Sequence, residues 1–74
     1  MPINYQRMIW EGWTVQDFIN ELEPSADTIM RGESFTRPFS SRSELKKWCI
    51  DNQPYYKHHI PDVVDYFAAK YQLR

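Results

Sequence analysis

The chain has 74 residues, the length of one small domain, and its nine basic and ten acidic side chains leave a formal net charge of −1. A net charge this close to zero provides no overall field to draw the protein to nucleic acid or to an anionic membrane. No run approaches the ~18 apolar residues of a membrane span, and the first residues lack the basic and apolar regions of a secretory signal. We therefore expect a cytoplasmic protein, with residues 1–74 forming a single domain that makes no contact with a membrane.

One cysteine and two histidines limit the chemistry that the chain can support. A lone cysteine excludes an internal disulfide, and with two histidines it is too few for a typical closed zinc site. Cys49 lies beside Trp48 on an expected buried stripe, where an apolar environment makes a thiol inert. We expect no catalytic residues, no metal and no other cofactor, so the protein is predicted not to be an enzyme.

Aromatic side chains make up 16% of the chain: three Trp, five Tyr and four Phe. Because each ring can bury roughly 150 to 250 Å², a few of them fill a small core. We expect the surplus to lie at the surface or at an interface, where Tyr and Trp are favoured.

The first expected element is a short helix over residues 5–11, capped by Asn4 and closed by Gly12. Seven residues do not form a stable helix in water alone, so this one depends on docking. A strand through residues 8–10 is the alternative, although the sequence shows no obvious strand to pair with it.

A clear helical pattern then follows over residues 15–22. Thr14 is the expected N-cap, with Asp17 three residues later, and Trp13 can clamp onto Phe18 as a hydrophobic staple. The apolar positions repeat at steps of three, four and seven: Val15, Phe18, Ile19 and Leu22.

Pro24 is predicted to break this helix and to begin a new short helix that runs through Arg31 and closes at Gly32. In outline, the pair resembles the layout of a helix-turn-helix domain. That resemblance implies DNA binding, but the second helix of the pair carries little that could contact base edges. The recognition role would therefore fall to residues 42–52.

Residues 33–40 have no helical period and read as an ordered loop that Phe35 and Phe39 anchor. The next helix extends over residues 41–52, where Ser41 caps the first turn and Glu44 reaches back to it. One face of this helix carries a buried stripe of Leu45, Trp48 and Cys49. Trp48 is expected at the centre of the core.

Residues 54–59 make at most a turn or two, and Pro61 then opens the last helix. This helix has a broad apolar arc, which implies contact with more than one neighbour: Val63, Val64, Phe67, Ala68 and Tyr71. The predicted fold is therefore all-α, a single small domain of four to five short helices around an aromatic-rich core.

The candidate binding surface lies in the second half of the chain. Residues 37–74 hold seven basic and four acidic side chains, whereas residues 1–36 hold two basic and six acidic ones. We expect a small non-enzymatic interaction or regulatory module that binds a protein partner through exposed aromatic rings and this basic pole. The expected partner-binding residues are Arg37, Arg42, Lys46, Ile50, Tyr55, Tyr56, Lys57 and His58.

Two alternatives remain open at the level of sequence. The basic second half could belong to a DNA-binding regulator, since cations meet phosphates and rings stack on bases. Self-association is the other alternative, because a marginal core with spare rings gains stability from it. Within the candidate surface, Ile50 either belongs to the binding face or is covered by the loop that holds Tyr55 and Tyr56.

Overall fold

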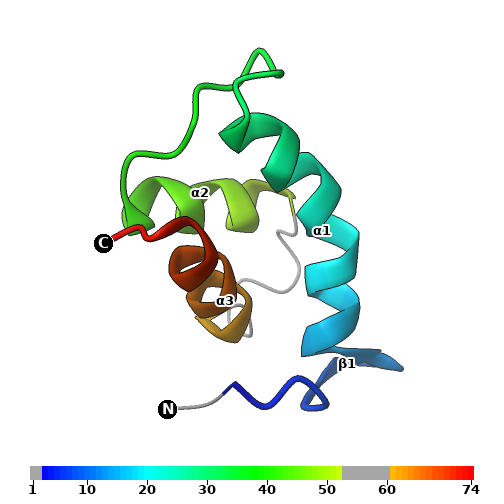
Figure 1. Ribbon diagram of the computed structural model, residues 1–74. Helices are drawn as coiled ribbons and strands as arrows, with labels where there is room; N and C mark the ends of the chain where they lie inside the picture. Colours follow the sequence, from blue (N-terminus) through cyan, green and yellow to red (C-terminus); the bar gives the residue numbers. More distant parts are fainter. Residues whose placement is uncertain (1–2, 53–60) are drawn as a thin grey trace.

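The computed structural model describes residues 3–52, apart from the side chain of Trp10, and residues 61–74. Within these residues the protein has three helices and one two-stranded antiparallel sheet (Figure 1). The elements are β1 (Met8–Trp10), β2 (Trp13–Thr14), α1 (Val15–Met30), α2 (Arg42–Asn52) and α3 (Pro61–Tyr71). The predicted all-α fold of four to five helices is therefore wrong.

The first error is the helix expected over residues 5–11, which is a β-hairpin instead. Met8 pairs with Thr14 and Trp10 with Trp13, and the pairing continues as the Val15 amide donates to the Arg7 carbonyl at 3.0 Å. Gly12 has a φ of +75°, so it turns the chain between strands and does not close a helix. The strand alternative was correct, and its partner is the short segment that precedes the helix cap.

α1 begins as the sequence predicts. Thr14 accepts a hydrogen bond from the Asp17 amide, and the Asp17 carboxylate accepts one in return from the Thr14 amide at 2.8 Å. This is a capping box, which satisfies two amides at the helix start. The predicted staple is confirmed, because the rings of Trp13 and Phe18 lie with centroids 5.2 Å apart.

The second error concerns Pro24, which lies inside one continuous helix. A proline at this position removes the hydrogen bond to the Asn20 carbonyl, and a clash with that turn normally breaks a helix. Asn20 is exposed, so water can satisfy its carbonyl. The buried stripe continues across the proline, since Leu22 and Ala26 are both buried. Burial of both halves therefore outweighs the cost of the proline.

Gly32 closes α1 two residues beyond its last helical residue, Met30, as predicted. Gly32 has a φ of +76° and its amide donates to the Ile29 carbonyl at 3.0 Å, while the Glu33 amide donates to the Thr28 carbonyl at 3.1 Å. This pair of bonds is a Schellman motif, which favours glycine at the left-handed position. It fixes the direction in which the chain leaves the helix.

α2 has the predicted cap with one difference. Ser41 accepts a hydrogen bond from the Glu44 amide at 3.3 Å, and the Glu44 carboxylate also accepts one from the Ser40 amide at 2.7 Å. α3 begins at Pro61, as predicted. It ends with Gln72 in the left-handed conformation at a φ of +57°, where the Leu73 amide donates to the Ala68 carbonyl at 2.8 Å.

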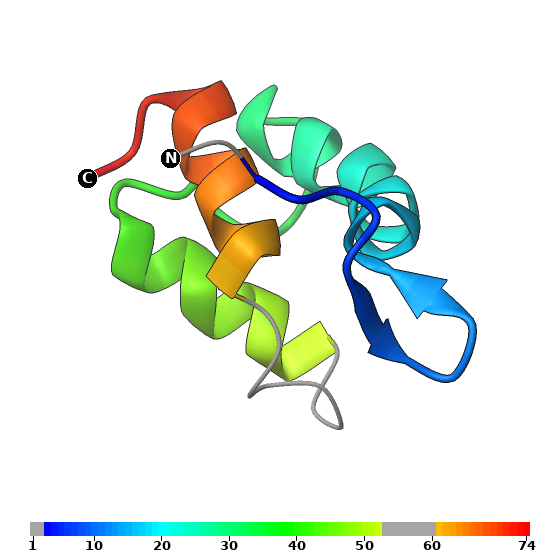
Figure 2. The same ribbon diagram turned by 90° about the horizontal axis from the view of Figure 1, so that it is seen from below.

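The core lies where α3 passes between α1 and α2 (Figure 2). Its largest fully buried side chains include Phe67, Ile19 and Leu45. Trp48 was expected at the centre, but it is only half-buried and packs at the margin of the core. Phe67 of α3 occupies the central position instead. In the described residues, no helix combines the length and the apolar character needed to cross a membrane.

Candidate functional site

Four of the eight expected binding residues lie in the described part of the chain, and they differ in exposure and in partners. Arg42 forms an ion pair with Asp65 of α3, and its amide donates to the Arg74 carbonyl at 2.9 Å. Ile50 is half-buried and packs against the core, whereas Lys46 is exposed. The other expected residues are Arg37, which is exposed in the loop before α2, and Tyr55, Tyr56, Lys57 and His58, which lie outside the described residues.

The loop of residues 33–40, here called the Phe35 loop, carries the most exposed aromatic side chain among those described. Phe35 has a relative exposure of 109%, whereas Phe39 is buried at 6%. The prediction that both rings anchor the loop is therefore right for Phe39 and wrong for Phe35. The loop projects beyond the end of α1 before it returns to α2 (Figure 1).

The loop is held at several points. The Schellman bonds fix its start, the Thr36 amide donates to the Ser34 hydroxyl at 3.2 Å, and Phe39 fixes its end in the core. Phe39 also packs on Trp48, with ring centroids 5.4 Å apart. Phe35 thus stands on a backbone that is tied at both ends and makes no contribution to the core itself.

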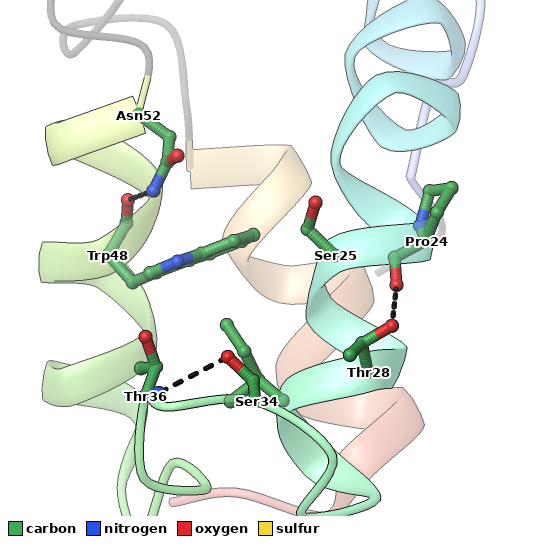
Figure 3. A pocket seen from close by; sticks show the side chains of 8 residues that line it. Pro24, Ser25, Thr28, Ser34, Thr36, Trp48 and Asn52 are labelled. Carbon is green, nitrogen blue, oxygen red and sulfur yellow. Dashed lines mark hydrogen bonds between the residues drawn. The ribbon is translucent and has the colours of Figure 1, made fainter.

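A groove of about 420 Å³ opens beside this loop, and we call it the Trp48 groove (Figure 3). The indole of Trp48 reaches from α2 toward Ser25 of α1. The lining consists of Pro24, Ser25, Thr28 and Ile29 from α1, Ser34 and Thr36 from the loop, and Trp48 and Asn52 from α2. None of these side chains is ionisable, so the groove suits an uncharged and partly apolar group.

Several polar groups of the Trp48 groove already have partners. The Thr28 hydroxyl donates to the Pro24 carbonyl at 2.9 Å, and the Asn52 amide group donates to the Trp48 carbonyl at 2.8 Å. The groove therefore offers the indole and some aliphatic surface together with polar groups such as the Ser25 hydroxyl.

A second hollow of about 320 Å³ shares Thr36 and Trp48 with the groove. Its charged lining is balanced, with two cations and two anions: Arg37, Lys47, Glu44 and Asp51. The Lys47 ammonium group lies 3.3 Å from the Asp51 carboxylate. We call the Phe35 loop, the Trp48 groove and this hollow together the Phe35 face.

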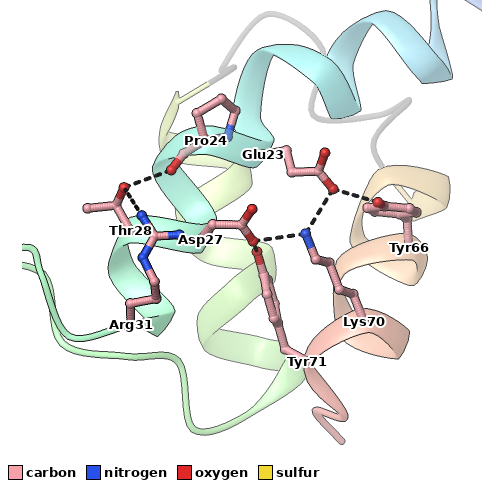
Figure 4. Close-up of polar contacts among 8 residues, drawn as sticks. All are labelled: Glu23, Pro24, Asp27, Thr28, Arg31, Tyr66, Lys70 and Tyr71. Atoms are coloured by element: carbon pink, nitrogen blue, oxygen red, sulfur yellow. Dashed lines mark hydrogen bonds and ion pairs between the residues drawn. The ribbon is translucent and has the colours of Figure 1, made fainter.

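A cluster of five polar residues joins α1 to α3 (Figure 4). Lys70 lies 3.0 Å from Glu23 and 2.9 Å from Asp27, Tyr66 donates to Glu23 at 2.5 Å and Tyr71 donates to Asp27. The Tyr66 hydrogen bond, with that of Lys70, lowers the pKa of Glu23. The hydrogen bonds of Tyr71 and Lys70 likewise lower the pKa of Asp27.

These polar contacts are structural. Both carboxylates are stabilised in the ionised form, and Asp27 and Glu23 raise the pKa of Lys70 so that it stays charged. No titratable group of the cluster is poised for proton transfer near neutral pH. We name this set the α1–α3 lock.

The remaining candidates for chemistry are also occupied or inert. Cys49 is buried as predicted, and its burial raises the pKa of the thiol to about 12. Asp62 lies 2.8 Å from Arg7, and Asp65 pairs with Arg42, so these two carboxylates have separate partners. Among residues 3–52 and 61–74, no group of three or more His, Cys, Asp or Glu side chains is arranged to hold a metal ion.

Sequence reasoning missed the Phe35 face for an identifiable reason. Two phenylalanines four residues apart in an aperiodic loop give no indication of which one is buried. The lining from α1 was also hidden, because the sequence predicted a separate short helix from Pro24 instead of one continuous helix. One signal was present: a single loop with two rings has more apolar surface than a small core needs.

The chain matches no model of a protein family, no curated protein and no solved structure in the comparisons made. The Phe35 face is therefore interpreted from its own geometry and chemistry.

Proposed function

We propose that the protein is a small non-enzymatic interaction module that binds a protein partner through the Phe35 face. The observation that carries this proposal is the full exposure of Phe35 beside the Trp48 groove. Burying one such ring stabilises a complex by roughly 1.5 to 3 kcal/mol before the costs of association. Aromatic anchors of this kind typically dominate binding energy at protein interfaces.

The fixed backbone around Phe35 supports this proposal. A side chain on a loop that is already ordered loses less conformational entropy on binding than one on an unrestrained segment. The hydrogen bond between Thr36 and Ser34 and the buried ring of Phe39 restrict the loop on both sides of Phe35. The backbone that carries Phe35 is therefore already ordered before a partner binds.

Of the binding residues expected from the sequence, Arg37 belongs to the Phe35 face, whereas Arg42 has a smaller role in the proposed interface. Arg37 lines the hollow next to Trp48 and can contribute to the rim of the interface. Arg42 contributes less, because its guanidinium group already pairs with Asp65. The basic pole expected from the sequence is consequently weaker at this face than its formal charge implies.

The distribution of charge also favours a protein partner over DNA. Five of the basic side chains in the described residues are paired with carboxylates: Arg7, Arg31, Arg42, Lys47 and Lys70. A DNA-binding surface needs several cations free to meet phosphates and to release counterions. The basic residues without a described carboxylate partner, such as Arg37 and Lys46, come from separate segments.

Affinity capture tests the proposal. The tagged chain is used to capture proteins from a lysate of its native cell, alongside Phe35→Ala and a matched control. The control, Met8→Ala, removes another exposed apolar side chain, in β1 at the opposite end of α1 from the Phe35 loop (Figure 1). We expect Phe35→Ala to lose specific partners at an unchanged melting temperature, and Met8→Ala to retain them. Unchanged capture by Phe35→Ala would contradict the proposal.

A binding assay with random duplex DNA at two salt concentrations addresses the alternative. We expect no binding at low salt. Micromolar affinity that falls steeply as salt rises would instead support a DNA-binding regulator.

A further inference from the structure

We propose that the partner of the Phe35 face is a second copy of this chain, with Phe35 of each copy seated in the Trp48 groove of the other. This inference rests on the proposed function and names the partner for the same face. It makes the assembly a closed twofold dimer in which each copy completes the site of the other.

Phe35, the side chain proposed to insert and here called the knob, lies next to the Trp48 groove of its own chain. Ser34 and Thr36 flank Phe35 in sequence, and both line the Trp48 groove. Phe35 itself stands outside the groove and is fully exposed. A twofold interface uses the same patch on both subunits, so one complementary contact is automatically made twice.

The chemistry of the groove fits a benzyl side chain. The groove is open to solvent, with a volume of about 420 Å³, and has no ionisable lining residue. Trp48 provides a ring, and aromatic pairs favour edge-to-face or offset contacts. Pro24 supplies aliphatic surface at the same site, whereas Ile29 is part of the lining but only 4% exposed.

The charges of the face suit an identical partner. A twofold interface places like residues near like residues, so a face with strong net charge would repel its own copy. Around Phe35, three cations and three anions balance: Arg31, Arg37, Lys47, Glu33, Glu44 and Asp51. Arg31 and Glu33 lie 3.0 Å apart and are 59% and 54% exposed, so they can exchange partners between two copies.

The contrast with the hairpin end of the molecule supports this choice. Exposed apolar side chains are also present there, including Met8 and Trp13. The neighbouring hollow, however, is lined by Asp17 and Glu21 without a cation. Two copies of that end would bring like charges together, whereas the Phe35 face carries no such penalty.

The fold gives no internal reason for a phenylalanine at position 35. Phe39 already anchors the loop, and Phe35 buries none of its surface in the monomer. A large exposed ring on an ordered loop gains stability only when another surface covers it. No side chain of the described residues fills the adjacent groove, and Trp48 gives it an aromatic ring that can provide that cover.

Sedimentation velocity from about 5 µM to about 1 mM tests the dimer. We expect the wild-type chain to show a reversible monomer–dimer equilibrium. Phe35→Ser, which removes the knob, and Ser25→Arg, which fills the groove from an exposed position, should each weaken association at least about tenfold. Met8→Ser is the matched control and should associate like the wild type.

Mixing the two interface variants provides a sharper test. Phe35→Ser retains a groove and Ser25→Arg retains a knob, so the mixture can form one intact contact. We expect a heterodimer in the mixture at concentrations where either variant alone is monomeric. Failure of the mixture to associate, while the wild type dimerises, would contradict the reciprocal arrangement.

Disulfide trapping locates the contact directly. Phe35→Cys and Ser25→Cys are mixed as separate chains under mild oxidation, and we expect a mixed disulfide dimer in far greater yield than either chain gives alone. The native Cys49 is buried and adds no background. Equal yields from the single variants and from the mixture would overturn the assignment of Ser25 as the neighbour of Phe35.

The remaining outcomes separate this inference from the proposed function. A wild-type chain that stays monomeric at about 1 mM overturns the dimer, and Phe35-dependent capture of another protein would then leave the proposed function standing. A monomeric chain whose capture does not depend on Phe35 overturns both. Growth beyond the dimer with concentration overturns the closed twofold arrangement in favour of a head-to-tail chain.

Discussion

Phe39 packs against Trp48 with ring centroids 5.4 Å apart and an interplanar angle of 52°. This contact fastens the Phe35 loop to α2 and places the indole beside the Trp48 groove. Trp48 therefore has two roles: it supports the loop from the margin of the core, and it offers a ring to whatever enters the groove.

Replacement of Trp48 by alanine should destabilise the fold by about 1 to 2 kcal/mol, less than for a core tryptophan, because the side chain is only half-buried. Phe67→Ala is the matched control. Phe67 is fully buried at the centre of the core, and its loss should cost about 3 to 5 kcal/mol. Urea titrations of the two variants measure the difference. Equal losses of unfolding free energy in the two variants would contradict this result and indicate that Trp48 is a central core residue.

Replacement of Pro24 by alanine should stabilise the protein by about 1 to 2 kcal/mol. The change restores an amide that can donate to the Asn20 carbonyl inside a continuous helix. The gain is smaller than the full helical cost of proline, since proline also restricts the unfolded chain. Thermal melts measure it. A lower melting temperature would show that the helix requires the proline at this point.

Replacement of Gln72 by glycine should stabilise the protein by about 0.5 to 1 kcal/mol, because Gln72 occupies the left-handed position that ends α3. The control is Ala69→Gly, in the exposed part of the same helix, which should cost about 1 kcal/mol. The two glycine substitutions thus have opposite predicted signs. If both substitutions lower the melting temperature, the left-handed conformation of Gln72 would be contradicted.

Stability should fall on both sides of neutral pH through the α1–α3 lock. The folded pKa values of Glu23 and Asp27 lie below their ordinary 4.5 and 3.8, so their contribution is present above those values and is lost as pH falls through the folded ones. The pKa values of Lys70 and Tyr66 are raised, mainly by hydrogen bonds to these carboxylates. Burial first, and then Asp27, raises that of Tyr71. Lys70, Tyr66 and Tyr71 stabilise the fold fully at pH values below their ordinary pKa values. This contribution is lost as the pH rises through their raised pKa values in the folded protein.

Glu23→Gln with Asp27→Asn should remove much of the acid dependence and lower stability at neutral pH. Glu21→Gln serves as the control, because Glu21 is an exposed carboxylate of the same helix that is not a member of the lock. Urea titrations at a series of pH values give the comparison. An acid limb that is unchanged in the double variant would show that other carboxylates control acid unfolding.

The elements that could be predicted are those specified by local signals. The cap at Thr14, the start of α3 at Pro61 and the end of α1 at Gly32 each depend on residues within one turn of the boundary. The hairpin was missed because β2 has only two residues, which is too short for an alternating pattern to appear. Trp13 and Thr14 were also assigned to the start of α1, where Thr14 is indeed the N-cap and Trp13 packs on Phe18.

The rest depends on contacts between distant segments. Glu23 and Tyr66 are separated by 43 residues, and nothing local to either one indicates that they meet. The continuity of α1 through Pro24 likewise depends on burial against the rest of the core. The Phe35 face combines a loop with two helices, so its existence could not be inferred before the fold was known.

Amide chemical shifts at about 10 µM and about 1 mM test most directly whether the Phe35 face is where two copies meet. We expect concentration-dependent shifts in the Phe35 loop, at residues 25–29 of α1 and around Trp48, with none in the hairpin. The same comparison with Phe35→Ser should show no change at any of these positions. Shifts that are absent in the wild type, or that fall on the hairpin instead, would contradict the account.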